Sequence, residues 1–178
     1  MSTVGDPLLK RDLTRKDIMD TNSTRTWLVR WLTLVAGVHV AVGDLLPWLA
    51  GAAVFDSYHA GIEAAFWPAG APAAARGLET WWIALFGPTV QAMALYMLAL
   101  IHLADRLRQP RIWLWLAGGL AVWAPQDILV SLRAACWPHV WADVAALAVM
   151  LPPLLWLWRH DTAAARTQAV AAATGATA

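Results

Sequence analysis

The chain has 178 residues, of which 60% are hydrophobic and only 14% charged, and its formal net charge is +1. A soluble domain is typically about a quarter charged and 45–50% apolar, so this composition disfavours a water-soluble monomer. It also disfavours disorder, which requires low hydrophobicity, and nucleic-acid binding, which requires a concentrated excess of Lys and Arg. The single cysteine, Cys136, excludes an internal disulfide and a cysteine-rich zinc site. The composition indicates a small polytopic membrane protein.

Four apolar stretches are long enough to cross a bilayer, which takes ~20 residues of helix. They cover residues of about 26–55, 78–103, 112–132 and 138–158. We therefore predict an all-α fold, a four-transmembrane-helix bundle over residues 26–158. Each stretch also contains proline, which either kinks the helices and opens space between them or is simply tolerated in membrane helices. These prolines are Pro47, Pro88, Pro125, Pro152 and Pro153.

The segments outside the four stretches are less apolar. Residues 1–25 form a polar leader, for which a short interfacial helix and a solvated segment are both open. Residues 159–178 are rich in Ala and Thr and are predicted to be a disordered tail. Between the first two stretches, the first half of the segment 56–77 is predicted to be a short amphipathic helix in the membrane interface.

The basic residues are distributed asymmetrically along the chain. Eleven of the 13 precede or open the first stretch, lie between the second and third, or follow the fourth, and only Arg76 and Arg133 lie on the opposite side. Positively charged loops stay in the cytoplasm, so both termini are predicted to be cytoplasmic. Together with the high content of Ala and Trp, this leads us to expect a bacterial inner membrane protein.

Each predicted span contains one carboxylate. Asp44 and Asp127 lie about 21 Å and 24 Å from the basic ends of their helices at 1.5 Å per residue, and Glu79 and Asp143 begin their helices on the outer side. All four are therefore expected in the outer third of the membrane. Ionisable residues at such depth are rare and usually face a bundle interior or a watery cavity. For Glu79 and Asp143 a second interpretation is open, in which they are favoured only by the helix dipole.

These carboxylates suggest acid–base chemistry or the binding of a cation. Burial and mutual repulsion favour the neutral form of some of them, and carboxyl groups in different protonation states are the usual pair for proton transfer. We take Glu79 and Asp44 as candidate catalytic residues. Nearby polar and aromatic side chains complete the candidate ligand site, namely Asp127, Gln126, Trp82, Trp123, Gln91, Trp48 and Asp143. His139 and Asp143 pair at i, i+4, but no spaced ligand set predicts a metal, and no cofactor is expected.

The second span has a recognisable pattern. Its residues Glu79 to Pro88 read E-T, six residues, then G-P, which resembles the second helix of emopamil-binding protein, a sterol isomerase of the EXPERA group. Asp44 on the first span, Gln126 and Asp127 on the third, and Leu151-Pro152 on the fourth are similar in kind. The resemblance extends over roughly residues 26–158.

The resemblance implies a membrane cavity, open sideways to lipid, in which acidic residues bind amphiphilic amines or sterols. Glu79 matches a functional glutamate of the group, and Asp44 matches an acidic residue of the sigma-two receptor, another member. The Asn and Trp of the isomerase's last helix would fall on Ala145 and Ala148, and a His-x-x-x-Glu similar to its catalytic pair occurs only at His59 and Glu63. The resemblance therefore implies binding more directly than isomerisation.

Two functions remain open from the sequence. The first is a carboxylate-lined intramembrane cavity that binds a sterol-like, terpenoid or amphiphilic ligand, with or without isomerising or cyclising it by proton transfer. The second is a non-enzymatic membrane partner or a small proton-coupled transporter. The expected partners are a hydrophobic small molecule and membrane lipid, with no nucleic acid, and a homodimer is also open.

Overall fold

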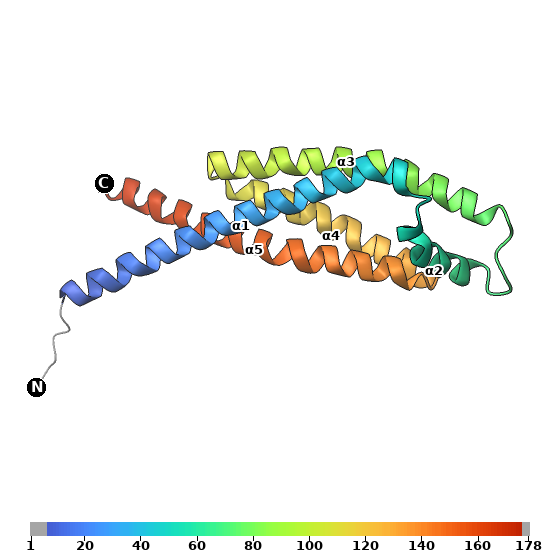
Figure 1. Cartoon of the computed structure of the whole chain (residues 1–178). Helices are drawn as coiled ribbons and strands as arrows, with labels where there is room; N and C mark the ends of the chain where they lie inside the picture. The colour runs from blue at the N-terminus through green and yellow to red at the C-terminus, as the bar shows by residue number, and fades with distance from the viewer. Residues whose placement is uncertain (1–6, 176–178) are drawn as a thin grey trace, which may run out of the picture.

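The computed structural model describes the backbone of residues 7–175 and the side chains of residues 21–175. Within these residues the chain is helical and contains no strand, which confirms the all-α prediction (Figure 1). The elements in chain order are α1 (Pro7–Leu49), the 3₁₀ turn η1 (Ala53–Phe55), α2 (Asp56–Phe66), α3 (Ala75–Leu107), α4 (Pro110–Arg133) and α5 (Trp137–Ala173).

The described part of the chain has four helices that are long and apolar enough to cross a membrane. They are Thr21–Leu49, Ala75–Leu107, Pro110–Arg133 and Trp137–Ala173. The start of α1 and the end of α5 lie at the same end of the bundle, as an even number of spans requires (Figure 1). We call this the Arg25 end, and the opposite end, which α2 covers, the α2 end. The predicted four-span membrane bundle is confirmed.

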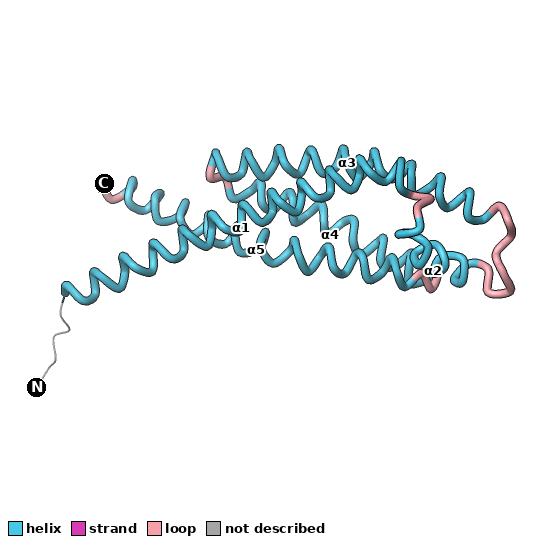
Figure 2. Tube along the Cα trace, viewed as in Figure 1, coloured by secondary structure: helices cyan, strands magenta, loops and turns pink. Residues whose placement is uncertain are grey.

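The bundle consists of two closely packed helix pairs, α1 with α3 and α4 with α5, which contact each other less extensively (Figure 2). Glycine brings the backbones of α1 and α3 together. A Cβ added to Gly43 would lie 2.5 Å from the backbone nitrogen of Gln91, and one added to Gly87 would lie 2.6 Å from Cδ of Pro47. Small residues permit this close approach in membrane helices, where packing takes the place of the hydrophobic effect.

The tightest packing is at the Arg25 end. There all four long helices contribute to one buried apolar cluster, formed by Leu32, Ala36, Ile101, Ala104, Trp113, Leu116, Ala117, Leu154 and Leu157. Trp113 has no exposed surface and is the largest buried side chain of the group. The two pairs are therefore joined firmly at this end of the bundle.

Two of the predicted boundaries are wrong. The first span ends at Leu49, not at residue 55, since the chain turns at Ala50 and Gly51 before the 3₁₀ turn. The tail from residue 159 is not disordered up to Ala173, because α5 continues through it. Alanine is the strongest helix former, and Asp161 fixes the start of this extension by the buried contacts described below.

The leader and the outer segment are also helical. The backbone of α1 begins at Pro7, a residue suited to the first helical position, so the described leader continues directly into the first span. The helix predicted in the outer segment is confirmed as α2. All of the prolines in the predicted spans lie inside continuous helices, as Pro47 does in α1 and Pro88 in α3.

Candidate functional site

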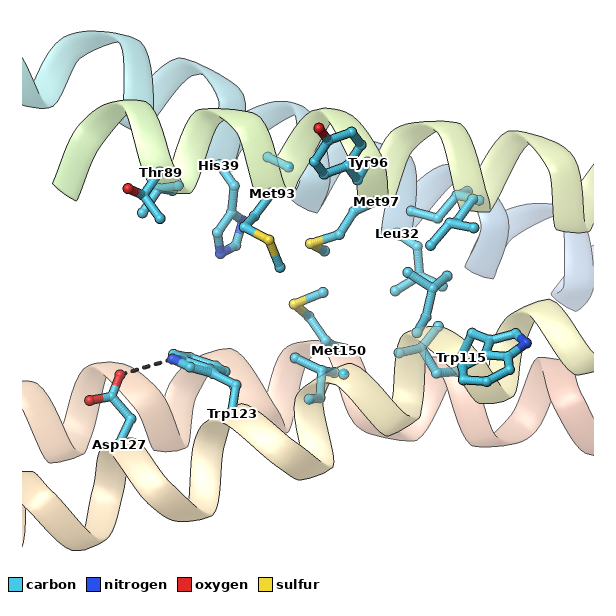
Figure 3. A pocket seen from close by; sticks show the side chains of 18 of the residues that line it. Leu32, His39, Thr89, Met93, Tyr96, Met97, Trp115, Trp123, Asp127 and Met150 are labelled. Carbon is cyan, nitrogen blue, oxygen red and sulfur yellow. Dashed lines mark hydrogen bonds between the residues drawn. The ribbon is translucent and has the colours of Figure 1, made fainter.

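A cavity of about 910 Å³ lies between the two helix pairs (Figure 3). Its walls come from all four long helices, with α3 and α4 contributing most of the lining. The apolar part of the lining includes Phe86, Met93, Met97, Leu100, Leu120, Val130 and Met150. Leu32 and Leu154 line it as well as belonging to the buried cluster, so the cavity extends from that cluster toward the α2 end.

The cavity opens to the surroundings of the bundle. Met93, Tyr96 and Trp115 line it and are also largely exposed, with Trp115 exposed by 76%. Met93 and Tyr96 belong to α3 and Trp115 to α4, so the open side lies between these two helices. In a membrane this side faces the acyl chains. Methionine is flexible and polarisable, so Met93, Met97 and Met150 can adapt to ligands of different shape.

The polar groups of the cavity gather toward one end. Asp127 lies there on α4, and its Oδ2 accepts a hydrogen bond of 2.9 Å from Nε1 of Trp123, one turn earlier (Figure 3). Gln126 also lines the cavity, and its amide donates to the carbonyl of Val122 at 2.6 Å. The cavity thus has a long apolar body and a polar end, and it includes three of the residues that the sequence predicted for ligand binding.

His39 is a lining residue that sequence analysis did not select. Its Nδ1 donates to the carbonyl of Val35 at 2.8 Å, because a carbonyl can only accept, and Nε2 is then an acceptor in the neutral ring. Figure 3 shows the ring beside Met93 at the cavity wall. Its position midway along an apolar span was the available signal, since polar residues at this depth usually face the bundle interior.

Glu79 is buried against α2 and is not among the residues that line this cavity. Its Oε2 lies 2.8 Å from Nδ1 of His59, and Nε2 of His59 donates to the carbonyl of Ala50, also at 2.8 Å. The other oxygen, Oε1, is buried without a hydrogen-bond partner. His59 therefore pairs with Glu79, not with Glu63 four residues on, and the pair fixes α2 over the ends of α1 and α3.

Asp44 is exposed on the side of α1. It accepts a hydrogen bond of 3.2 Å from Nε2 of Gln91 on α3. Trp48 is 82% exposed and Trp82 is 57% exposed, and none of these four residues lines the cavity. Among the described residues no hydrogen bond or ion pair joins Asp44 to Glu79. The two predicted catalytic carboxylates thus lie in separate environments.

Asp143 is buried beside Asp127. Its Oδ1 lies 3.9 Å from Nε2 of His139, and the same nitrogen lies 3.4 Å from Oδ1 of Asp127. Nδ1 of His139 is 2.8 Å from the hydroxyl of Tyr58 on α2. Burial, with the nearby Cys136, Asp143 and Asp127, raises the pKa of Tyr58 to about 12, so its hydroxyl keeps its proton at neutral pH.

Arg76, near the start of α3, links that helix to α2. Its Nε donates to Glu63 at 2.8 Å and its Nη1 to Asp56 at 3.0 Å. The hydrogen bond from Arg76 holds the pKa of Glu63 below its usual value, so this link persists at neutral pH.

A second polar cluster closes the Arg25 end. The side chain of Arg25 is 2% exposed and donates to both oxygens of Asp161, at 2.8 Å and 3.0 Å, and also to Asp105. Asp161 accepts a further hydrogen bond of 2.9 Å from Nε1 of Trp113 and lies 3.0 Å from Nδ1 of His160. The cluster joins α1, α3, α4 and α5 at the end of the bundle remote from the polar end of the cavity.

Comparisons with protein families, with curated proteins and with solved structures find no match to this chain.

Proposed function

We propose that this protein binds an amphiphilic hydrophobic molecule, of sterol-like or terpenoid type, in the cavity between α3 and α4. The observation that carries the proposal is the combination of volume and polarity. A cavity of about 910 Å³ with an apolar body and a few polar groups at one end has the character of a small-molecule site. Its open side between α3 and α4 gives a ligand dissolved in the bilayer a direct route of entry.

The residues at the two ends of the cavity have different roles in this proposal. The apolar lining holds the hydrocarbon body of the ligand by dispersion contacts, because in lipid these contacts take the place of the hydrophobic effect. Asp127 and Gln126 receive its polar group, and Trp123 offers a ring face to a cationic group. A protonated amine or a hydroxyl fits such an end, since the carboxylate accepts a hydrogen bond from either.

Asp127 anchors the ligand in this account, whereas Glu79 and Asp44 do not contact it. Glu79 instead holds α2 in place through His59, and Asp44 links α1 to α3 through Gln91. The proposal is therefore one of binding. The protein would serve as a receptor or carrier for the ligand in the membrane, and the resemblance of residues 79–88 to the EXPERA group supports the same class of ligand.

We also propose that the protein resides in a bacterial inner membrane with the Arg25 end in the cytoplasm. The support is the distribution of basic residues, since 11 of 13 lie at the ends of the spans, or in the segments next to them, on that side. The cavity's polar end, at Asp127, is then in the outer leaflet.

The anchoring role of Asp127 is tested with two ligands that share one hydrocarbon body. Geranylgeranylamine and geranylgeraniol are added to the full-length protein in detergent with EDTA, and bound ligand is counted by native mass spectrometry. The Asp127→Asn variant should bind the amine roughly 10- to 100-fold more weakly, as expected for a lost charge-assisted hydrogen bond, and the alcohol within about twofold. Asp44→Asn is the matched control, because it removes an exposed carboxylate outside the cavity.

Two results would contradict this role. One is that wild-type protein binds neither compound, and the other is that Asp44→Asn weakens amine binding as much as Asp127→Asn does.

A further inference from the structure

Three side chains with metal-binding atoms meet at the α2 end of the bundle. Asp127 comes from α4, and His139 and Asp143 come from successive turns of α5. One ligand atom from each lies within 4.8 Å of the others. Nε2 of His139 is 3.4 Å from Oδ1 of Asp127 and 3.9 Å from Oδ1 of Asp143. The cluster therefore presents one imidazole nitrogen and two carboxylates to a common point.

The neighbours of the cluster orient these atoms as in metal sites. A histidine that binds through Nε2 in its neutral form carries its proton on Nδ1, which then needs an acceptor. The hydroxyl oxygen of Tyr58, 2.8 Å from Nδ1, is in place to accept it. Similarly, Trp123 donates to Oδ2 of Asp127 and leaves Oδ1 directed at His139. Two of the three side chains are thus fixed by a hydrogen bond that leaves the ligand atom free.

Asp143 provides a separate indication. Its side chain is buried to more than nine tenths, yet its Oδ2 has no hydrogen-bond partner. A buried carboxylate oxygen without a partner is costly, so native structures normally supply a donor or a cation. The ion pairs of the described residues give Asp127 and Asp143 no cationic partner except His139. Carboxylates bind a metal in their ionised form, and with neutral histidine the metal-binding form of the cluster carries two negative charges, which one divalent cation balances.

From these contacts we propose that Asp127, His139 and Asp143 bind one divalent transition-metal ion, of the Zn²⁺ type, at the polar end of the cavity. Imidazole and carboxylate together suit Zn²⁺, Mn²⁺, Fe²⁺ or Co²⁺, whereas Ca²⁺ needs six or more oxygens. Ligand atoms about 2.0 Å from a tetrahedral ion lie ~3.3 Å apart, close to the His139–Asp127 separation. The His139–Asp143 separation exceeds this spacing by ~0.6 Å, and all three ligand atoms lie within 4.8 Å of one another, so a bound ion would draw the Asp143 carboxylate closer.

Such an ion would have a vacant position. Three protein ligands leave room for water or a ligand atom, as in zinc sites that do chemistry. Asp127 lines the cavity, so the ion would meet the polar group of the bound molecule. It would favour a hydroxyl or carboxylate oxygen over a protonated amine. This last statement rests on the proposed function, whereas metal binding itself does not.

The experiment measures metal binding by full-length protein in detergent, with any affinity tag removed. After EDTA treatment and desalting, Co²⁺ is added stepwise and its visible d–d absorption is recorded. The bound metal is then counted by elemental mass spectrometry. We expect one Co²⁺ per chain, displaced by Zn²⁺. Asp127→Asn, His139→Gln and Asp143→Asn should each weaken binding by at least about 100-fold, and Tyr58→Phe by roughly 10-fold, the range seen for groups that orient metal ligands.

The controls match the chemistry of the ligands. Asp44→Asn and His102→Gln remove a carboxylate and an exposed imidazole outside the cluster, and both should bind Co²⁺ as the wild type does. The proposal is overturned if folded wild-type protein, judged by its helical circular dichroism and monodisperse elution, takes up no Co²⁺ at micromolar concentration. It is equally overturned if binding persists in all three ligand variants.

Two further variants keep the test decisive. If Asp143→Asn fails to fold, Asp127→Asn, His139→Gln and Tyr58→Phe decide the outcome, because the side chains of Asp127 and His139 are 26% and 29% exposed and that of Asp143 is only 4% exposed. A Gly119→Phe variant, which fills the cavity from α4, should retain the metal. In that variant ligand binding and metal binding are measured separately. A failure of metal binding in the wild type therefore counts against this inference alone, and unchanged ligand binding in Gly119→Phe counts against the proposed function alone.

Discussion

Asp161 shows how much one residue outside the predicted spans contributes to the fold. It accepts hydrogen bonds from Arg25 and Trp113, and its side chain is only 3% exposed. The residues that meet here are up to 136 positions apart in the chain, so no local pattern could associate them. The buried ion pair stabilises the helices at the Arg25 end only while both partners are present.

We predict that Asp161→Asn destabilises the protein by about 3 kcal/mol. The substitution leaves the Arg25 guanidinium buried without its main counter-charge, and breaking one partner of a buried pair typically costs 3–5 kcal/mol. The free energy is measured by SDS-induced unfolding followed by circular dichroism. Asp56→Asn is the control, because Asp56 is an exposed partner of Arg76 and its loss should cost less than about 1 kcal/mol. Equal effects of the two substitutions would contradict the role of the buried cluster.

Residue patterns identified three residues that line the cavity, but they did not predict which side chains the candidate residues contact. Trp123, Gln126 and Asp127 were selected from depth and spacing, and all three line the cavity. The partner of Glu79 was not predictable, because His59 reaches it from a helix outside the spans. The grouping of Asp127 with His139 and Asp143 depends on how α4 and α5 are rotated relative to each other, which hydropathy does not determine.

At the scale of elements, the crossing of α1 and α3 depends on two glycines. A Cβ added to Gly43 or to Gly87 would lie within 2.8 Å of backbone atoms of the other helix. Backbone atoms cannot move aside as a flexible side chain does, so a methyl group at either position must push the helices apart. The pair α1 and α3 forms one wall of the cavity, so their close contact helps to fix the position of that wall.

We predict that Gly43→Ala destabilises the protein by roughly 1–3 kcal/mol, the usual cost of overpacking a close contact. The matched control is Gly37→Ala on the same helix, where an added Cβ meets nothing within 4 Å. Gly37→Ala should leave the stability unchanged or raise it slightly, because alanine favours the helix. Thermal unfolding of both variants checks this, and a Gly43→Ala protein as stable as the wild type would show that the two backbones are not in contact.

Element boundaries were predictable where hydropathy changes sharply and not elsewhere. The third span was predicted at 112–132 and is observed as Pro110–Arg133, bounded by proline and arginine. The extension of α5 to Ala173 was missed because an Ala-rich, Thr-rich sequence reads as low complexity, although alanine itself favours helix.

At the scale of the whole molecule, the bundle is firmly packed at the Arg25 end and hollow toward the α2 end. The buried apolar cluster and the Arg25–Asp161 pair close the Arg25 end. The cavity and the group formed by Asp127, His139 and Asp143 lie nearer the α2 end. This gradient gives the proposed ligand site a rigid base and an open side toward lipid.

The orientation of the molecule is tested by labelling single cysteines in intact cells. In a Cys136→Ala background, Ala71→Cys lies between α2 and α3, and Gln109→Cys lies in the turn between α3 and α4. A membrane-impermeant maleimide should label residue 71 directly and residue 109 only after the cells are permeabilised. The reverse pattern would place the Arg25 end outside.

The central claim, that the cavity between α3 and α4 binds a hydrophobic molecule, is tested most directly by filling it. Gly119 lines the cavity and Gly118 does not, and an added Cβ meets nothing within 4 Å at either position. Geranylgeraniol binding is counted by native mass spectrometry for Gly119→Phe and for its neighbour Gly118→Phe. We predict that Gly119→Phe lowers affinity at least about 10-fold while Gly118→Phe leaves it unchanged, because only the first ring occupies the cavity. Unchanged binding by a folded Gly119→Phe protein would contradict the account.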